Sequence, residues 1–406
     1  MTNSFTEYDG NAEAFADTLF QSSGGISLVS GSVTFFGKNS AASTFDSLSL
    51  GKAKIDGPGI LLTSGDGTPP SSNTSGSYGQ HNLGMSASDS DLQAIINGAF
   101  PSAGVTQDAS VLTFKVNAAA GVKTIMFDVV FGSDEYPEFS SSTFVDIAAV
   151  MVNGKNAAFF GGDSKKPLSI LDQNKGYFQD NTNGSIQIEY DGVSNKLTVI
   201  AKVKEGVNDI KIAIADTGDS SYDSGIFIAN VRGSDKDFEG ILNEISGSAG
   251  KDNLRAVKGI DNILFGGLGK DKLQANTGKD VLYGDEDGSD GASSMAAEES
   301  LFKSSLSKDK FVFKSKKVLD KKVDKTDIIA DFDKKDVIDF SKMIKPKLDF
   351  IGKSGFSKDG DGEVRYKQFK KDGFTAVYVD TNGDGKVDAS LKVLGLHKFN
   401  DGDFSL

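Results

Sequence analysis

The stretch GGLGKDKLQANTGKDVLYGDEDG, residues 266–288, places an aspartate after each Gly-Lys pair, and these two aspartates are nine residues apart. The same period extends back to residue 247, as GSAGKDNLR, AVKGIDNIL, then Phe265, then GGLGKDKLQ and ANTGKDVLY. Glycines permit tight turns, an apolar residue points into a thin core, and an aspartate supplies charge. The apolar residues in phase are Leu254, Ile263, Leu273 and Leu282. The period therefore indicates a repeat architecture.

The aspartates in phase are Asp252, Asp261, Asp271 and Asp280. Their context resembles the GGxGxDxUx nonapeptide of hemolysin-type (RTX) calcium-binding repeats. In that family two repeats form one coil of a parallel β-roll, so the resemblance implies stacked carboxylate pairs with calcium between them. The pairs would be Asp252 with Asp271, and Asp261 with Asp280. Phe265 makes both spacings 19 rather than 18 residues, which predicts a local bulge. A glycine- and aspartate-rich linker without metal is the alternative.

A second candidate calcium site is the segment DTNGDGKVD, residues 380–388. Asp380, Asn382 and Asp384 occupy positions 1, 3 and 5 of calcium-loop spacing, and Asp388 occupies position 9. Position 12 is Leu391 instead of a bidentate glutamate, and the flanks have strand patterns. The segment therefore favours a calcium loop outside an EF-hand, with a metal-free Asn-Gly hairpin as the alternative.

Residues 309–406 resemble the region that follows the repeats in serralysin-type secreted proteases, through DKFVF, TDIIADFD, DVIDFS and the final DFSL. In that family the region carries an uncleaved signal for type I secretion, which implies export and a type I secretion machinery as partner. The first 20 residues lack the basic start and apolar run of a cleavable signal peptide, which agrees with a secretion signal in the C-terminal region. The protease motif H-E-x-x-H is missing, and His81 and His397 are too far apart in sequence to make it.

The part of the chain before the repeats contains a series of segments that alternate or run apolar between glycine, asparagine and aspartate turns, for example VKTIMFDVVFG and DIKIAIAD. Such spacing predicts a β-sandwich. Helical periodicity predicts two short helices, at residues 11–20 and 91–100. The second helix is expected to be capped by Ser88 or Ser90 and to end at Gly98.

Residues 10–233 also resemble the choice-of-anchor L domain, through the stretches GILLTSGDG, FGSDEYPEF, YFQDN and IAIADTGDSSYDSGIFI. That family occurs in bacterial surface and secreted proteins and is named for its varied C-terminal anchors. The resemblance implies an extracellular or surface location, with the repeat region as the appended module. It supplies no biochemical activity.

Two of these motifs carry six carboxylates, namely Asp134, Glu135 and Glu138 after one strand, and Asp216, Asp219 and Asp223 before another. If the loops meet at one end of the sandwich, a cation, raised pKa values or backbone N–H caps must relieve the repulsion. We expect calcium at Asp134, Glu135, Asp219 and Asp223. Turn-capping aspartates and a catalytic carboxylate pair are the alternatives. The chain has no tryptophan for a sugar platform, which disfavours a glycosidase.

Composition narrows the range of partners. The 406 residues include no cysteine, which excludes disulfides, thiolate metal sites and a cysteine nucleophile. The formal net charge of -13 disfavours nucleic acid and anionic lipid and favours cations. No apolar run approaches the ~18 residues of a membrane span, so no membrane insertion is expected.

These patterns predict a mainly β protein with three segments. A choice-of-anchor L-like β-sandwich with one or two short helices covers residues 1–236, a short parallel RTX β-roll covers 237–290, and a β-rich type I secretion region covers 291–406. We interpret the chain as a secreted, non-enzymatic, calcium-binding protein of the bacterial cell surface or extracellular matrix, acting in adhesion or assembly in a biofilm or surface layer. The expected partners are calcium ions, the secretion machinery, and a surface polysaccharide, a surface protein or further copies of the chain. The alternative is a carbohydrate-acting enzyme or lectin that uses the acidic loops.

Overall fold

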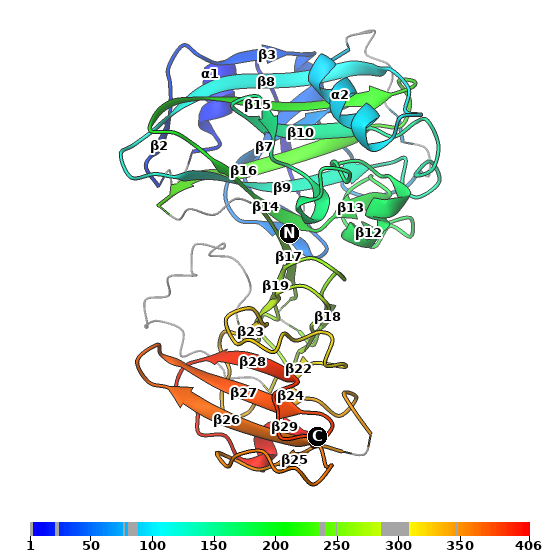
Figure 1. Ribbon diagram of the computed structural model, residues 1–406. Helices are drawn as coiled ribbons and strands as arrows, with labels where there is room; N and C mark the ends of the chain where they lie inside the picture. Colours follow the sequence, from blue (N-terminus) through cyan, green and yellow to red (C-terminus); the bar gives the residue numbers. More distant parts are fainter. Residues whose placement is uncertain are drawn as a thin grey trace. The chain divides into compact units, whose positions relative to one another are not determined.

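The computed structural model describes residues 3–20, 24–75, 78–79, 88–235, 240–248, 250–285, 308–345 and 347–406, and His81 lies outside these ranges. The chain divides into two compact units, residues 1–242 (unit 1) and residues 243–406 (unit 2), which we describe separately. Both units are built mainly from strands (Figure 1), which confirms the predicted mainly β fold class. The finer division into three segments stays a prediction.

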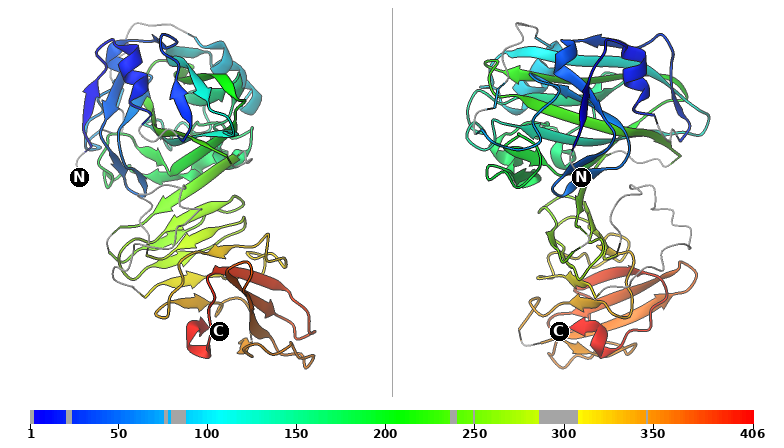
Figure 2. Two further views of the ribbon diagram at one scale, coloured as in Figure 1. Left: turned by 90° about the vertical axis from the view of Figure 1, so that its left-hand side faces the viewer. Right: turned by 180° about the vertical axis from the view of Figure 1, so that it is seen from behind.

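Unit 1 is a β-sandwich of two antiparallel sheets that pack against each other (Figures 1 and 2). In strand order, sheet 1 contains β1 (Phe5–Glu7), β4 (Ala42–Phe45), β7 (Gly59–Thr63), β16 (Ser224–Ser234), β9 (Thr124–Ser133) and β14 (Lys196–Lys202), with β13 (Gly192–Ser194) on β9 and β12 (Phe178–Asp180) on β13. Sheet 2 contains β11 (Lys155–Asn156), β10 (Ile147–Val152), β15 (Gly206–Thr217), β8 (Thr106–Ala118) and β2 (Ile26–Leu28), with β3 (Thr34–Phe36) also on β8. The strands β5 (Leu48–Leu50) and β6 (Ala53–Ile55) form a separate hairpin.

Both predicted helices are present, with two corrections at the ends of the second. Helix α1 spans Ala12–Asp17, and the side chain of Asn11 caps it by accepting from the N–H of Ala14. Helix α2 spans Ser90–Ala99 and is capped by Asp89, whose carboxylate accepts from two N–H groups of the first turn, rather than by Ser88 or Ser90. The helix also continues through Gly98. Asp89 is the stronger cap because its charge is held in place by an ion pair with Lys211 at 2.7 Å. Single 3₁₀ turns occur at Asn39–Ala41 (η1), Phe160–Gly162 (η2) and Asp172–Tyr177 (η3).

Sheet 1 is covered on both faces, which determines the surroundings of the acidic motifs. Val130 and Phe227 belong to a core cluster that includes the β5–β6 hairpin and Tyr190. Val129 and Phe131 point to the opposite face of the sheet because side chains alternate along a strand, and they too are 0% exposed. The carboxylates that follow β9 therefore begin from a strand with no solvated face.

Unit 2 contains a roll of two parallel sheets (Figure 2). One sheet has the order β17 (Gly240–Ser246), β19 (Asn262–Phe265), β21 (Val281–Tyr283), β23 (Ile328–Ile329) and β28 (Ala389–Leu394). The other has the order β18 (Asn253–Arg255), β20 (Lys272–Gln274), β22 (Lys310–Val312), β24 (Val337–Asp339) and β29 (Phe404–Ser405). Beyond β28 the first sheet continues with the antiparallel strands β27 (Phe374–Asp380) and β26 (Glu363–Phe369), then the short β25 (Asp349–Phe350), and a 3₁₀ turn η5 (Asp401–Asp403) precedes β29. The same two parallel sheets therefore run on both sides of residue 290.

The core of the roll differs from the predicted apolar phase at one position. Leu254, Leu273 and Leu282 lie in the core cluster, as the repeat predicts, but Leu264 takes the place expected for Ile263. The reason is the inserted Phe265: β19 pairs with β21 with Leu264 opposite Leu282, a one-residue shift relative to the repeat phase. Because side chains alternate along a strand, this shift exchanges which residue faces the core.

We expect Leu273→Ala to lower the free energy of unfolding of unit 2 by about 2–5 kcal/mol, because it removes a fully buried side chain from the roll. Leu268→Ala, in the same repeat, is the matched control, since Leu268 is 46% exposed and its loss should change stability by less than about 0.5 kcal/mol. Urea unfolding of the full chain in saturating calcium, followed by hydrogen exchange of peptides from unit 2, measures both. Equal effects of the two substitutions would contradict the assigned core face.

Candidate metal sites

The aspartates that precede the strands of the second sheet of the roll form a continuous row. This aspartate row consists of Asp252, Asp271, Asp309 and Asp336, which lie before β18, β20, β22 and β24. Each backbone N–H donates to Oδ1 of the next aspartate in the row, at 2.8 Å from Asp252, 2.7 Å from Asp271 and 2.9 Å from Asp309. The last three carboxylates are almost fully buried. The predicted neighbourhood of Asp252 and Asp271 is thus present, and the row continues beyond it.

Burial makes the aspartate row costly to ionise. Burial is the main cause that raises the pKa of Asp271 to about 7 and that of Asp336 to about 8. The negative charge of Asp309, which lies between them in the row, raises both pKa values further, and N–H donors oppose the rise. Oδ2 of Asp271 has no hydrogen-bond partner. A cation between the carboxylates would relieve this cost, which is the electrostatic condition for a calcium site.

Sequence reasoning missed the later members of the row, although a signal for them exists. Asp309 and Asp336 each stand two residues before a buried apolar residue, Phe311 and Ile338, as the repeat aspartates do. Asp327 stands in the same relation to Ile329 in the other sheet. The aspartate-x-apolar pattern thus persists after the glycines of the nonapeptide have been lost.

In the first sheet of the roll, the charge of Asp261 contributes, after burial, to the raised pKa of Asp280, as expected for neighbours, but the two residues are not in register. The register places Asn262 in line with Asp280, and the N–H and side-chain amide of Asn262 both donate to Oδ1 of that carboxylate, at 3.2 and 2.7 Å. Asp261 is exposed and accepts from the N–H of Lys279 at 2.7 Å. Asp280 is fully buried, and burial raises its pKa to about 6. The one-residue shift at Phe265 therefore places the amide of Asn262, and not the carboxylate of Asp261, in direct contact with Asp280.

The loop at residues 381–388 joins two antiparallel strands, β27 and β28. The carboxylate of Asp380 accepts from the N–H groups of Asn382, Gly383 and Gly385, at 3.1, 2.8 and 2.7 Å. Asp384 forms a salt bridge with Lys386 at 3.6 Å, and Asp388 forms one with Lys316 at 3.1 Å. Because these groups are already satisfied by backbone donors and lysines, the contacts favour the metal-free hairpin. Calcium at Asp380, Asn382, Asp384 and Asp388 stays a prediction.

In unit 1, the acidic motifs meet at one end of the sandwich. Asp134 and Glu135 follow β9 and Asp223 precedes β16, both in sheet 1, while Asp216 lies near the end of β15 in sheet 2. A fifth residue, Asp146, directly precedes β10, beside Asp216 in the sheet. All five side chains are between 0% and 3% exposed, and we call them the carboxylate cluster. Sequence reasoning missed Asp146 because the stretch TFVDIAAVMV has the pattern of an ordinary buried strand.

Backbone donors satisfy only part of the carboxylate cluster. Glu135 accepts from the N–H of Asp146 at 3.0 Å, and Asp146 accepts from the N–H of Thr217 at 3.2 Å. Asp134 accepts from the N–H of Tyr78, and Asp223 accepts from the N–H of Asp66 at 3.1 Å. One carboxylate oxygen each of Asp134, Asp146 and Asp216 has no hydrogen-bond partner. Turn capping therefore explains some of these carboxylates but leaves three buried oxygens without a donor.

The electrostatics of the cluster follow from its burial. Burial, as the largest cause, raises the pKa of Asp134 and of Asp146 to about 8. The pKa values of Glu135 and Asp216 are also raised well above their usual range, by burial first and then by the charge of Asp146. The charge of Asp146 thus makes Glu135 and Asp216 harder to ionise.

Two of the six predicted carboxylates lie at the rim of the cluster. Asp219 is partly exposed and accepts from the N–H of Ser221 at 3.2 Å, which is a turn-capping contact. Glu138 is exposed. Among the residues that the structure describes, no three histidine or acidic side chains already form a group able to hold a metal ion. The metal assignments therefore rest on burial, unpartnered oxygens and charge, and the role of Asp219 as a ligand stays a prediction.

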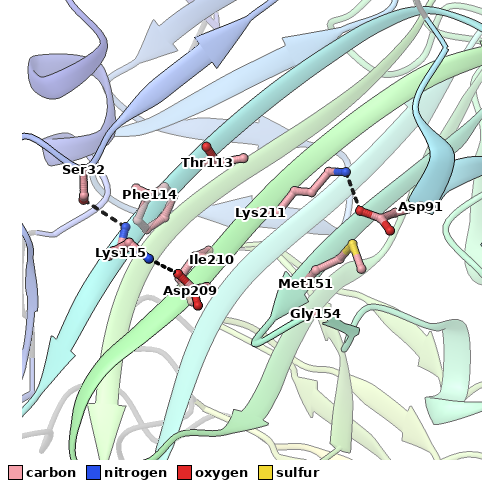
Figure 3. A pocket seen from close by; sticks show the side chains of 10 residues that line it. All are labelled: Ser32, Asp91, Thr113, Phe114, Lys115, Met151, Gly154, Asp209, Ile210 and Lys211. Carbon is pink, nitrogen blue, oxygen red and sulfur yellow. Dashed lines mark hydrogen bonds and ion pairs between the residues drawn. The ribbon is translucent and has the colours of Figure 1, made fainter.

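A shallow hollow of about 270 Å³ lies on the outer face of sheet 2 (Figure 3). Its charged side chains already pair with each other: Lys115 with Asp209, and Lys211 with Asp91 at 2.7 Å. Phe114 and Met151 also line it, but none of the carboxylate cluster does. These self-neutralising pairs do not favour a charged ligand.

In calcium-free solution we expect the melting temperature to fall as the pH rises from about 5 to about 9. The raised pKa values, about 6 for Asp280, about 7 for Asp271 and about 8 for Asp134, mean that the folded chain keeps protons that the unfolded chain has already released above pH ~4. Stability from these groups is therefore lost as the pH passes through their folded pKa values. Circular dichroism melts in resin-decalcified buffers measure this, with saturating calcium as the control that should flatten the dependence. A melting temperature that rises with pH without calcium would contradict the argument.

Comparison with known proteins gave no match among curated proteins. Among solved structures, the AlgE6R3 subunit of the Azotobacter vinelandii mannuronan C5-epimerase is 20% identical, with a TM-score of 0.26, over 40% of this chain and 77% of that one. The structure of TmCBM61 in complex with beta-1,4-galactotriose is 10% identical, with a TM-score of 0.21, over 56% of this chain and 96% of that one. Neither likeness is close enough to carry an argument about fold or ligand.

Protein families give firmer matches. Residues 6–232 match the choice-of-anchor L domain, and residues 217–406 match the serralysin C-terminal domain of peptidase M10. Neither is a catalytic domain, and together they indicate a secreted protein located outside the cell or at its surface. Within the described ranges, no helix is long and apolar enough to cross a membrane. With more than half of its length matched, the chain belongs to the choice-of-anchor L domain family and carries a serralysin-type C-terminal region.

Proposed function

We propose that this protein is a calcium-binding component of the cell surface or extracellular matrix, acting in adhesion or assembly, and that unit 2 folds on calcium after export. The observation that carries the proposal is the aspartate row. Its strands, such as β18, β20 and β22, have only three residues each, so few backbone hydrogen bonds oppose the repulsion between stacked carboxylates. Calcium between the coils would turn that repulsion into cohesion.

The donor chemistry of the row supports calcium over other metals. The ligands on offer are carboxylate and backbone oxygens, which suit hard cations, and the chain has no cysteine for softer metals. Extracellular calcium modules bind at about 10⁻⁴ to 10⁻³ M, so such a site would be empty at cytosolic calcium levels and filled outside the cell. Folding would then follow export, which fits the serralysin-type C-terminal region.

Burial of the carboxylate cluster supports a binding role for unit 1 over a catalytic one. A general acid or base has to reach its substrate, but Glu135, Asp146 and Asp216 are at most 1% exposed. The chain also lacks tryptophan for a sugar platform. We therefore assign adhesion or assembly to the outer surface of the sandwich, with a surface polysaccharide, a surface protein or another copy as partner.

Calcium-dependent folding of unit 2 is the direct test. We expect hydrogen exchange in residues 250–285 and 308–345 of the full chain to be fast in chelator and strongly slowed in millimolar calcium, because the cation offsets the charge of the row. Asp271→Asn removes one buried ligand and should raise the calcium midpoint about tenfold, equivalent to about 1.4 kcal/mol. Asp359→Asn, which changes an exposed turn residue, is the control and should leave the midpoint unchanged. Equal protection with and without calcium would remove the proposal.

Export supplies a second test. Deleting residues 401–406 should leave the chain inside its host cell while unit 1 still folds, because this segment carries the acidic and apolar end that resembles the secretion signal. The deletion also removes the packing of Phe404 on Phe340. Phe340→Ala loses the same contact but keeps residues 401–406, so it should still be exported. If the protein that lacks residues 401–406 still appears in the medium at the normal level, the secretion signal lies in another part of the chain.

A further inference from the structure

We propose that unit 1 has a calcium site of its own, between its two sheets, where Glu135, Asp146 and Asp216 close around the ion as carboxylate ligands from positions that do not yet form a metal-binding group. This site is independent of the aspartate row in unit 2. It also differs from the set expected from sequence, Asp134, Glu135, Asp219 and Asp223, because only Glu135 is common to both and Asp146 and Asp216 are the other carboxylates. The proposal concerns a cation inside the sandwich, not one on its loops.

The position of the three carboxylates is the first argument. Asp216 lies in β15 of sheet 2 and Asp146 directly precedes β10, where the paired residues Ile147 and Ala215 hold the two side by side. Glu135 follows β9 of sheet 1, and its carboxylate accepts from the N–H of Asp146 at 3.0 Å. The cluster therefore spans the space between the sheets, so a cation bound there would tie the two sheets together at this end.

The second argument is the set of polar atoms without partners. Oδ2 of Asp146 and Oδ1 of Asp216 have no hydrogen-bond partner, and neither has the hydroxyl of Thr217. All three residues are at most 1% exposed. A buried polar atom without a partner costs roughly 1–3 kcal/mol, and more when it is charged. Oxygen atoms from carboxylates and hydroxyls at one place are suitable donors for a hard divalent cation.

The third argument is a contrast within the same sandwich. Asp128 is also almost fully buried, but Arg232 lies 2.9 Å from it and Lys196 lies 4.0 Å from it. Burial alone would raise the pKa of Asp128, yet these two cations hold it below its usual range. In the described part of the chain, Glu135, Asp146 and Asp216 form no salt bridge with lysine or arginine, so the positive charge that balances Asp128 has no counterpart here.

Protons are the competing explanation for the missing positive charge. Asp146 and Asp216 are neighbours, next to the paired residues Ile147 and Ala215, so one shared proton would neutralise part of the cluster. Asparagine substitution separates the two explanations. It should stabilise unit 1 in all conditions if protons alone are present, but should abolish a calcium effect if an ion is bound.

The experiment is hydrogen exchange with mass spectrometry on the full chain, with and without calcium chloride, followed in peptides covering residues 124–152 and 206–234. In the wild type, calcium should slow exchange in these peptides at least about tenfold. Asp146→Asn and Asp216→Asn should abolish that slowing, while Glu138→Gln, an exposed carboxylate in the same motif, should keep it. Peptides from residues 250–285 and 308–345 report the roll separately and should remain calcium-dependent in all three variants.

Several outcomes would overturn the site. One is a hydrogen-exchange rate in unit 1 of the wild type that is the same with and without calcium, even if the rate in the roll changes. Another is variants that are more protected than the wild type both with and without calcium, which identifies a protonated carboxyl pair. Slowing by magnesium but not by calcium would overturn the choice of ion. If both aspartate variants fail to fold, Glu135→Gln should lose the calcium effect, and its retention would equally contradict the proposal.

Discussion

Carboxylates buried without a matching positive charge are the constraint on which both units depend. In unit 2 they stack along the roll, where Asp271 and Asp336 have pKa values raised to about 7 and about 8. In unit 1 they meet between the sheets at Glu135, Asp146 and Asp216. Leaving such groups charged and unpaired costs several kcal/mol each, comparable with the net stability of a domain. A protein with this arrangement is stable only when protons or cations occupy the carboxylates, which makes its folding sensitive to its surroundings.

The two units meet this constraint with different amounts of other stabilisation. Unit 1 has long strands, such as β8 and β15, and cores on both faces of sheet 1, so packing can hold the cluster in place before any ion binds. In unit 2 the strands β18 to β22 have three or four residues each, and the core between them is a thin line of leucines and phenylalanines. Its coils therefore depend more strongly on whatever neutralises the aspartate row. For this reason we expect unit 1 to be compact, and unit 2 to be unfolded, in an exported chain that has not yet bound calcium.

Much of the fold could be predicted from sequence, because the period of nine and the alternation of the strands are local signals. The core positions Leu254, Leu273 and Leu282 follow from the repeat phase, and the sandwich follows from strand spacing. The inserted Phe265 predicts an irregularity in the repeat, but the sequence does not show which residues it moves into register. Only the pairing of β19 with β21 shows that Leu264 faces the core and that Asn262 lies opposite Asp280. In the candidate site of unit 1, sequence placed Asp134, Glu135 and Asp216 near one another but missed Asp146, because no local pattern states which strand ends will meet. Asp219, prominent in its motif, turned out to cap a turn.

Whether calcium replaces protons on these carboxylates is the central claim, and proton release on calcium binding measures it most directly. Calorimetric titration of the full chain at about pH 7, repeated in buffers of different ionisation enthalpy, gives the number of protons released. The account predicts net release near neutral pH, falling to almost none at about pH 9, where groups with folded pKa values of about 7 and about 8 have already ionised. Calcium binding without proton release at neutral pH, or no calcium binding at all, would contradict it.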